Sequence, residues 1–279
     1  MAAAEMVEPV EGPEDHAFRE LLAKIARESG FRCSSYKERC LRRRIAVRLR
    51  ARGVHAFADY ATLLDGDAGE WERLLDALTI NVTRLFRDPS TFDALARVVV
   101  PALWRLDAPA LRVWSAGCAS GEEAYSLAAL FHRHAEQLGQ PARAGRVCVL
   151  GSDIDRGSLD AAARGCYAEP AFADTPAALR ERYFARPAGC AAPELRAMVR
   201  WERRDLLHDS PPPGALHLIV CRNVLIYFDR RSQEELLARF RAALAPGGFL
   251  VLGKVETLLG EARAGFEAAQ PRERIFRRT

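Results

Sequence analysis

The sequence predicts an α/β protein in which a small all-helical domain precedes a larger domain built on a parallel sheet. Two observations carry this prediction. Apolar residues recur at helical spacing up to about Val100, whereas from Leu111 onward short β-rich runs alternate with helical segments. Strands that alternate with helices form βαβ units, and such units build a parallel sheet. A chain of 279 residues is long enough to bury a core in both parts.

The helical domain is expected to cover residues 15–88. It follows an Ala-, Glu- and Pro-rich start, residues 1–14, whose composition is typical of a disordered segment. Stripes of apolar side chains, separated by short breaks that contain Gly, predict helices near residues 18–25, 35–51, 57–64 and 71–78.

The larger domain is expected to cover residues 110–279, after a linker at 89–109. Its β-rich runs predict strands of the parallel sheet at 111–115, 145–151, 216–221 and 246–252. Helices are expected between them at 122–138, 155–164 and 230–244. The last two runs, 266–269 and 273–277, are typical of an antiparallel hairpin at the sheet edge. Because the alternation lapses over residues 165–200, we interpret that stretch as an inserted subdomain.

Charge and cysteine content limit the class of protein. Lys and Arg number 41 against 37 Asp and Glu, a formal net charge of +4, and Lys occurs only at positions 24, 37 and 254. No apolar run reaches the roughly 18 residues of a membrane span, and the acidic start lacks the features of a signal peptide. The seven Cys include no CxxC pair. We therefore expect reduced thiols in a cytoplasmic protein, no membrane insertion and no metal site.

The loop after the first predicted strand, Gly117-Cys-Ala-Ser-Gly121, is the first candidate ligand site. Doubly wound folds place ligands at such loops, where glycines allow close approach of the backbone. Its GxxxG spacing does not match the dinucleotide fingerprint, and Glu122 and Glu123 would repel a pyrophosphate but suit a cationic or zwitterionic ligand. The alternative is that both acids only favour the helix dipole, and the spacing leaves the two interpretations even.

The segment after the second predicted strand, Ser152-Asp-Ile-Asp155, is the second candidate. An acid at that position can accept both hydroxyls of a ribose, and it can alternatively cap the next helix. Since two acids allow both roles, we assign ribose binding to Asp153 and capping to Asp155.

Two further segments carry polar groups near the expected crevice. Cys221-Arg-Asn-Val-Leu-Ile-Tyr-Phe-Asp229 presents Arg222, Asn223 and Tyr227 after a predicted strand, although a turn with a core-packed Tyr is a fair alternative. Asn81-Val-Thr-Arg-Leu-Phe-Arg-Asp-Pro89 follows the helical domain, and alone it indicates only a helix that ends in a turn.

Taken together, the four segments resemble the chemotaxis receptor methyltransferases of the CheR type, which are S-adenosylmethionine-dependent protein-glutamate O-methyltransferases. The resemblance extends from about Asp15 to the C-terminus. It implies a class I (Rossmann-like) methyltransferase sheet with an inserted small subdomain behind a small all-α N-terminal domain. It also implies S-adenosylmethionine as the cofactor, with S-adenosylhomocysteine as product, and the cytoplasmic region of a chemoreceptor as the partner.

The resemblance further implies roles for individual residues. Arg87 and Tyr227 are expected to be catalytic, Arg87 by orienting the substrate carboxylate and Tyr227 by donating a hydrogen bond to it. Cofactor contacts are expected from Asn81, Thr83, Arg87, Glu123, Asp153, Asp205, Leu206, Asn223 and Val224.

Seven arginines crowd the second helical segment, between positions 39 and 52. Such a run of charges usually marks a solvent-exposed helix face, and nucleic-acid binding is an alternative function for it. With the resemblance we favour contact with the acidic methylation region of a receptor, through electrostatic steering. The expected substrate-binding residues are Arg39, Arg42, Arg43, Arg48 and Arg50.

Two departures from the family pattern and two rival functions complete the expectations. The Pro- and Ala-rich residues 185–199 are short against relatives that dock a receptor pentapeptide, so tether binding is not expected. The family's Gly-His-Ser-Glu is Gly253-Lys-Val-Glu256 here.

A cofactor-binding scaffold without turnover is the alternative function. A nucleic-acid methyltransferase is less favoured, because the chain lacks the Asn/Asp-Pro-Pro-aromatic tetrad and a paired catalytic Cys.

Overall fold

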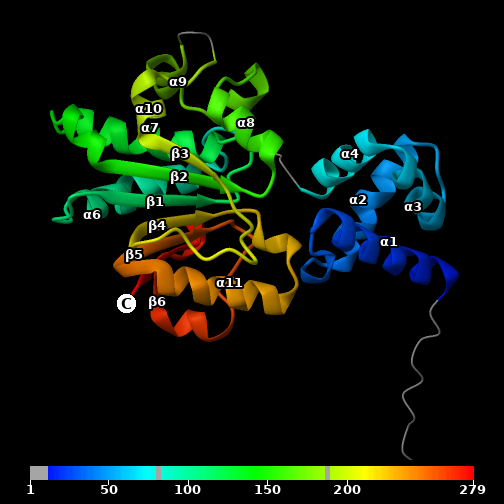
Figure 1. Cartoon of the computed structure of the whole chain (residues 1–279). Helices are drawn as coiled ribbons and strands as arrows, with labels where there is room; N and C mark the ends of the chain where they lie inside the picture. Colours follow the sequence, from blue (N-terminus) through cyan, green and yellow to red (C-terminus); the bar gives the residue numbers. More distant parts are fainter. Residues whose placement is uncertain (1–11, 80–82, 186–188) are drawn as a thin grey trace, which may run out of the picture. The chain divides into compact units, whose positions relative to one another are not determined.

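A computed structural model describes residues 12–79, 83–185 and 189–279, and it divides the chain into two compact units between Thr79 and Ile80. Figure 1 labels their elements. Among the described helices, none is both long and apolar enough to cross a membrane.

The first unit is all-helical, as predicted. Its elements are α1 (Pro13–Ser29), the short 3-10 turn η1 (Cys33–Ser35), α2 (Glu38–Ala51), α3 (Phe57–Gly66) and α4 (Ala68–Leu78). The predicted stripes form its core, in which Phe18, Leu21 and Ile25 of α1 meet side chains of the other three helices. The expectation of disorder over residues 1–14 lies outside the described residues except at its end, where Pro13 and Glu14 already belong to α1.

A buried ion pair ties three helices of this unit together. Glu70 of α4 is fully buried, and its carboxylate accepts hydrogen bonds from both Nε and Nη2 of Arg48 in α2, at 2.9 and 2.7 Å. The hydroxyl of Tyr60 in α3 donates a third bond at 2.7 Å. Removing one partner of such a pair leaves a buried charge and costs about 3–5 kcal/mol.

The second unit carries a seven-stranded sheet in the order β3-β2-β1-β4-β5-β7-β6. Its strands are β1 (Leu111–Ala116), β2 (Val147–Asp153), β3 (Val199–Arg203), β4 (Leu216–Cys221), β5 (Leu244–Leu252), β6 (Phe266–Gln270) and β7 (Ile275–Arg278). The first five are parallel, whereas β7 pairs antiparallel with both β5 and β6, as the sequence predicts. Figure 1 shows β3 at one edge of the sheet and β6 near the other.

Helices cover both faces of this sheet. The principal ones are α7 (Glu122–Gln137), α8 (Arg156–Arg164) and α11 (Arg230–Ala243). Trp114 of β1 packs edge-on against Phe240 of α11, while its neighbour Val113 belongs to the core that contains the buried side of α7. Because successive strand residues point to opposite faces, α11 and α7 lie on opposite sides of the sheet.

The expected boundary at residue 88 and the expected linker at 89–109 are wrong. The Leu85 N–H donates to the Ala171 carbonyl at 3.0 Å, and Leu85 and Phe86 are buried in the core of the second unit. The supposed linker forms α5 (Pro89–Ala94), a π-helical turn η2 (Leu95–Val99) and α6 (Val100–Trp104). Pro89 begins α5, since the first turn needs no N–H from Pro, and Pro101 lies where the π-helical turn η2 continues directly into α6.

The segment expected to be an inserted subdomain lies between α8 and β4 and holds a strand that the sequence analysis missed. It contains η4 (Glu169–Phe172), α9 (Ala177–Phe184), α10 (Pro193–Met198) and β3. Figure 1 shows α9 and α10 near α7, and their buried side chains join the same core as α7. β3 pairs with β2 at the sheet edge, where three of its five residues are exposed and no apolar run marks it.

Two cysteines of this segment correct the expectation of reduced thiols. Cys166 and Cys190, 24 residues apart, form a disulfide at an isolated antiparallel bridge. The bridge places the two side chains next to each other, a pairing that sequence spacing does not reveal. The other five cysteines are free.

Candidate functional site

The predicted motifs meet at the carboxyl ends of the parallel strands, where open α/β sheets bind ligands. A pocket lies there within the second unit. Six of the predicted cofactor-binding or catalytic residues line it: Thr83, Arg87, Glu123, Asn223, Val224 and Tyr227. Its other lining residues are Arg84, Gly117, Cys118, Ala119 and Arg222. Asn81, also predicted, lies outside the described residues.

The glycine loop between β1 and α7 is held against the end of β2. The N–H groups of Gly117 and Cys118 both donate to the Ser152 carbonyl at 2.9 Å, and the Ala119 N–H donates to Asp153 Oδ2 at 2.8 Å. Gly117 has a φ of 79°, and a Cβ there would lie 2.6 Å from Cγ2 of Val224. Only glycine therefore allows this loop to approach the loop after β4 so closely.

Of the two roles predicted for the acids after β2, the structure tests the capping role of Asp155. The Asp155 side chain accepts the Gly157 N–H and caps α8, as predicted. Asp153 is buried, and its two oxygens accept the N–H groups of Ala119 and Asp155. A carboxylate has about four acceptor positions, so Asp153 keeps capacity for a ligand. Burial raises the pKa of Asp153, and these backbone bonds oppose the rise.

Glu123 is the acid that faces the pocket from α7. It is buried, and burial raises its pKa against the opposing effect of Arg222. The Ser115 hydroxyl donates to its Oε1 at 2.7 Å, and Arg222 Nη1 lies 3.4 Å from its Oε2. Glu122, in contrast, accepts from the Ser120 hydroxyl and does not line the pocket. The two acids are thus not equivalent, although the sequence leaves the helix-dipole explanation open for both.

Glu256 holds the loop after β4 in place, a role that the sequence analysis missed. Its Oε2 accepts the N–H groups of Gly253 and Asn223 at 2.6 and 3.0 Å, and its Oε1 those of Val224 and Ile226 at 2.9 and 3.3 Å. Asn223 has a φ of 61°, a conformation that needs such support. The signal was the G-x-x-E spacing after β5, because a Cβ at residue 253 would lie 2.7 Å from Oε2.

The segment before α5 supplies Thr83, Arg84 and Arg87 to the pocket. Phe86 anchors it: the ring is buried 5.3 Å from that of Phe92, and the backbone N–H donates to the Ser126 hydroxyl at 2.9 Å. Phe86 and Asp88 both have a positive φ, at 56° and 61°. This strained turn sends the Phe86 side chain away from the pocket that its neighbours line.

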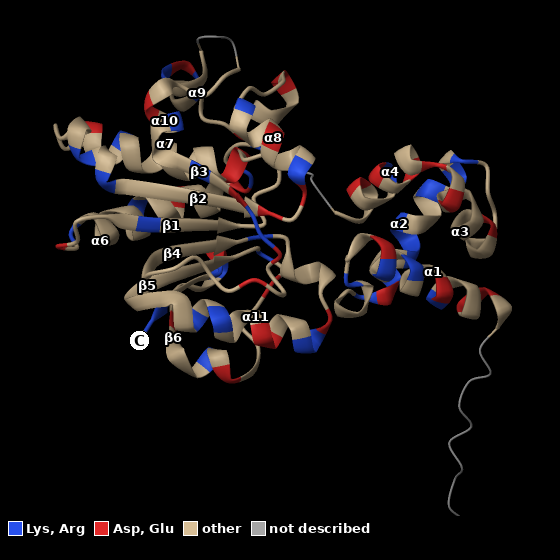
Figure 2. Cartoon of the chain, viewed as in Figure 1, with Lys and Arg blue, Asp and Glu red and all other residues tan. Residues whose placement is uncertain are grey.

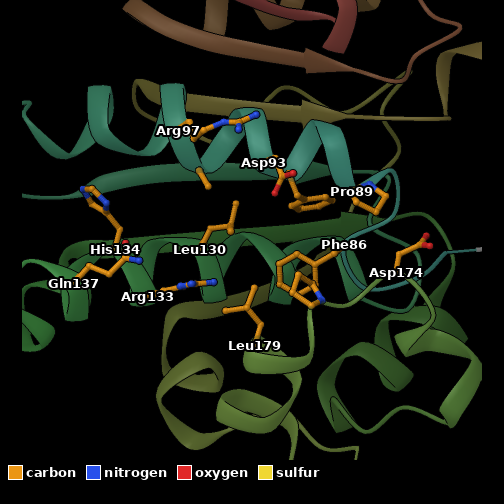
Figure 3. Close-up of a pocket in the computed structure, with 13 residues that line it drawn as sticks. Phe86, Pro89, Asp93, Arg97, Leu130, Arg133, His134, Gln137, Asp174 and Leu179 are labelled. Carbon is orange, nitrogen blue, oxygen red and sulfur yellow. The ribbon is translucent and has the colours of Figure 1, made fainter.

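The side chain of Phe86 faces a second cavity of about 280 Å³, which Figure 3 shows. Phe86, Leu130 and Leu179 project toward its centre, and Arg97 and Arg133 lie among its walls. None of the predicted cofactor-binding residues that the structure describes lines this cavity. The smaller pocket, and not this one, is therefore the candidate site.

Asp205 and Leu206 do not line the described pocket, and their expected contacts with the cofactor stay a prediction. The Asp205 carboxylate accepts the Leu207 N–H at 2.8 Å and contacts His208 Nδ1 at 2.6 Å, while Leu206 is buried. Their chain neighbour Arg204 donates its N–H to the carbonyl of Asp153. Both residues thus follow directly after the position where β3 meets the end of β2.

The arginines of α2 separate into two groups, and Figure 2 shows the basic residues along this helix. Arg48 is engaged by buried Glu70, and Arg42 pairs with Asp15 and Glu38 and stacks on Phe18 at 4.0 Å. Both side chains therefore make contacts within the unit, and their predicted contacts with a receptor stay predictions. The three that remain exposed, with no ion pair in the described part of the chain, are Arg39, Arg43 and Arg50.

Comparison with known proteins agrees with the division into two units. Residues 16–79 match the all-alpha domain of CheR methyltransferases, and residues 81–275 match their SAM binding domain. Chemotaxis protein methyltransferase 2 of Pseudomonas aeruginosa is 35% identical over 87% of this chain and 86% of its own length. The chemotaxis protein methyltransferase of Escherichia coli is 34% identical over 87% of this chain and 84% of its own.

A third relative carries a similar sequence as part of a longer chain. An uncharacterized 104.1 kDa protein of Rhodobacter capsulatus is 38% identical over 86% of this chain, which spans only 25% of that relative. Both domain models match in order and together cover most of the residues. The chain therefore belongs to the CheR methyltransferase family, and its second unit is an S-adenosylmethionine-dependent methyltransferase domain.

Proposed function

We propose that the protein transfers a methyl group from S-adenosylmethionine to the side-chain carboxylate of glutamates in a chemoreceptor, in the cytoplasm, and forms a glutamyl methyl ester. The observation that carries the proposal is the pocket that joins Arg87 and Tyr227 with buried Glu123. Two relatives of similar length are named chemotaxis protein methyltransferases, which supports a substrate in chemotaxis.

The residues present fit the cofactor. Glu123 offers a carboxylate to an ammonium group, and Asp153 offers acceptor capacity to ribose hydroxyls. The backbone of Gly117 lies in the pocket wall without a side chain that would fill the space. When bound, S-adenosylmethionine supplies a methyl group that its sulfonium activates for transfer.

The pocket also fits a reaction that needs no general base. A glutamate carboxylate, with an ordinary pKa of about 4.3, is already ionised at neutral pH. Among the described lining residues, Glu123 is the only carboxylate, and Ser115 and Arg222 already engage it. Burial raises the pKa of the Cys118 thiol well above its ordinary value, which disfavours the nucleophilic thiolate.

Catalysis then depends on orientation and on exclusion of water. The planar guanidinium of Arg87 can hold a carboxylate through two parallel hydrogen bonds. The hydroxyl of Tyr227 can donate one bond to the same group. Fixing the attack geometry in this way is worth several orders of magnitude in rate.

The exposed face of α2 provides a surface for an acidic substrate. Arg39, Arg43 and Arg50 follow each other at helical spacing, so they share one face of α2 with Val47, whose side chain is 49% exposed. Basic groups around an exposed apolar side chain suit the acidic helices of a receptor methylation region. Steering by such charges raises the association rate at low ionic strength.

The test is transfer of labelled methyl from S-adenosylmethionine to cytoplasmic fragments of chemoreceptors. Base-labile label that disappears when the acceptor glutamates are changed to alanine supports the proposal. Binding of the cofactor without transfer to any fragment would support the scaffold function instead. Label on RNA would support a nucleic-acid methyltransferase.

A further inference from the structure

The guanidinium of Arg222 occupies an unusual position beside the candidate site. Arg222 follows β4 directly, its side chain is only 2% exposed, and it also lines the pocket. The guanidinium lies 5.4 Å from the centre of the Phe92 ring. Its Nε is buried with no hydrogen-bond partner in the described structure. A buried charge of this kind is costly unless it is well paired, so its contacts indicate its role.

Three contacts connect Arg222 to two separate parts of the site. Nη1 lies 3.4 Å from Oε2 of Glu123 on α7. Nη2 donates to Oδ2 of Asp88 at 2.6 Å and to the backbone carbonyl of Arg87 at 2.8 Å. One side chain therefore contacts both the acid that faces the cofactor pocket and the turn that carries Arg87.

The turn needs this support, because Phe86 and Asp88 on either side of Arg87 both have a positive φ. A non-glycine residue in that region costs on the order of 1 kcal/mol or more and persists only where its surroundings fix it. The Asp88 side chain makes no cap contact to α5. Its ion pair with Arg222 instead connects the turn before α5 to the residue that follows β4.

We propose that Arg222 is a positioning residue that aligns Glu123 for the ammonium group of the cofactor and Arg87 for the substrate carboxylate. The inference rests on the proposed function and adds a residue to it: one guanidinium couples cofactor binding to substrate orientation. Arg222 itself needs no contact with the methyl group.

The charges around Glu123 make this role measurable. Ser115 of β1 and Arg222 face its carboxylate, Glu256 approaches from the loop after β5, and the thiols of Cys118 and Cys221 lie near. Among these groups, Arg222 alone is a cation, and Arg84 and Arg87 line the same pocket. Without Arg222 the pKa of Glu123 rises further, because the largest effect that opposes burial is then lost.

The experiment measures calorimetric binding of S-adenosylhomocysteine across pH 6 to 9, together with kcat and KM for methyl transfer. In Arg222→Met we expect an affinity loss of about tenfold or more at the acid end that recovers as the pH rises, since each unit of pKa corresponds to about tenfold. The unchanged protein is expected to show a flatter profile. Arg230→Met, which removes an arginine 80% exposed on α11, is the control and should match the unchanged protein.

Two further variants separate positioning from general loss of structure. Arg222→Lys keeps a cation and should restore the flat pH profile, but a single ammonium cannot bridge all three partners, so kcat stays low. Asp88→Asn loosens only the turn and should lower kcat with little change in affinity. An Arg222→Met protein that folds and has the control's pH profile and kcat would overturn the inference.

Failure of this inference and failure of the proposed function are distinguishable. The binding profile needs no receptor, so it tests the contact with Glu123 even if no glutamate is methylated. Conversely, full methyl transfer by Arg222→Met would overturn the role of Arg222 and leave the proposed function intact.

Discussion

Replacing Glu256 by glutamine tests how the loop after β4 is held. The carboxylate of Glu256 accepts four backbone N–H bonds, two on each oxygen. In Glu256→Gln one oxygen becomes an NH2 group, which leaves two of these buried donors facing another donor. An unsatisfied buried donor costs about 1–3 kcal/mol. Removal of the buried charge offsets part of this loss, so we expect a net destabilisation of about 2–4 kcal/mol.

The assay combines denaturant unfolding of the full chain with amide hydrogen exchange. Faster exchange is expected among the four N–H donors to Glu256, which are Gly253, Asn223, Val224 and Ile226. Affinity for S-adenosylhomocysteine should fall because Asn223 and Val224 line the pocket. Glu235→Gln, at a side chain 60% exposed on α11, is the control. Surface changes of that kind stay within about 0.5 kcal/mol. If Glu256→Gln exchanges and unfolds like the control, the reasoning is refuted.

Three further predictions concern orientation, the basic surface and pH. Arg87→Ala should lower kcat for methyl transfer by about 10²-fold, the scale of a misplaced reactant; near-normal turnover would exclude an orienting role. Reversing Arg43 to Glu should raise KM for a receptor fragment at low salt and less at high salt, whereas Arg48→Glu should instead destabilise the first unit through Glu70. Burial acts to raise the pKa of Glu70, but hydrogen bonds from Arg48 and Tyr60 outweigh it and the pKa is lowered. Stability from Glu70 is therefore complete above its ordinary pKa of 4.5 and is lost as the pH falls through the lowered value, and Glu70→Gln should show a shallower acid unfolding curve.

The sequence predicts much of the sheet because its parallel strands are buried. β1, β2, β4 and β5 are mostly apolar, and polar groups that follow them gather at the carboxyl ends of these strands. The sequence does not predict β3, because this strand lies at the sheet edge, where exposed charged side chains interrupt the apolar pattern. The sequence also does not predict the helices after Pro89, because proline occurs at helix starts as well as in linkers.

The sequence predicts residues of the candidate site only where they belong to a recognisable motif. Thr83, Arg87, Glu123, Asn223, Val224 and Tyr227 belong to recognisable segments, and the structure brings them into one pocket. Arg222 acts through contacts between distant parts of the chain, which spacing along the sequence does not encode. For Glu256, which also contacts a distant loop, the G-x-x-E spacing after β5 was the signal. The ion pair between Arg48 and Glu70 was not predicted, since a charge run does not reveal which of its members pairs with a buried acid.

Identification of the methylated group tests the central claim most directly. The protein is incubated with S-adenosylmethionine and a receptor cytoplasmic fragment, and tandem mass spectrometry locates the methyl group. We predict base-labile methyl esters on glutamate side chains of the fragment, formed about 10²-fold more slowly when Arg87→Ala is used. Methylation of another residue type, or bound cofactor without any methylated glutamate, would contradict the account.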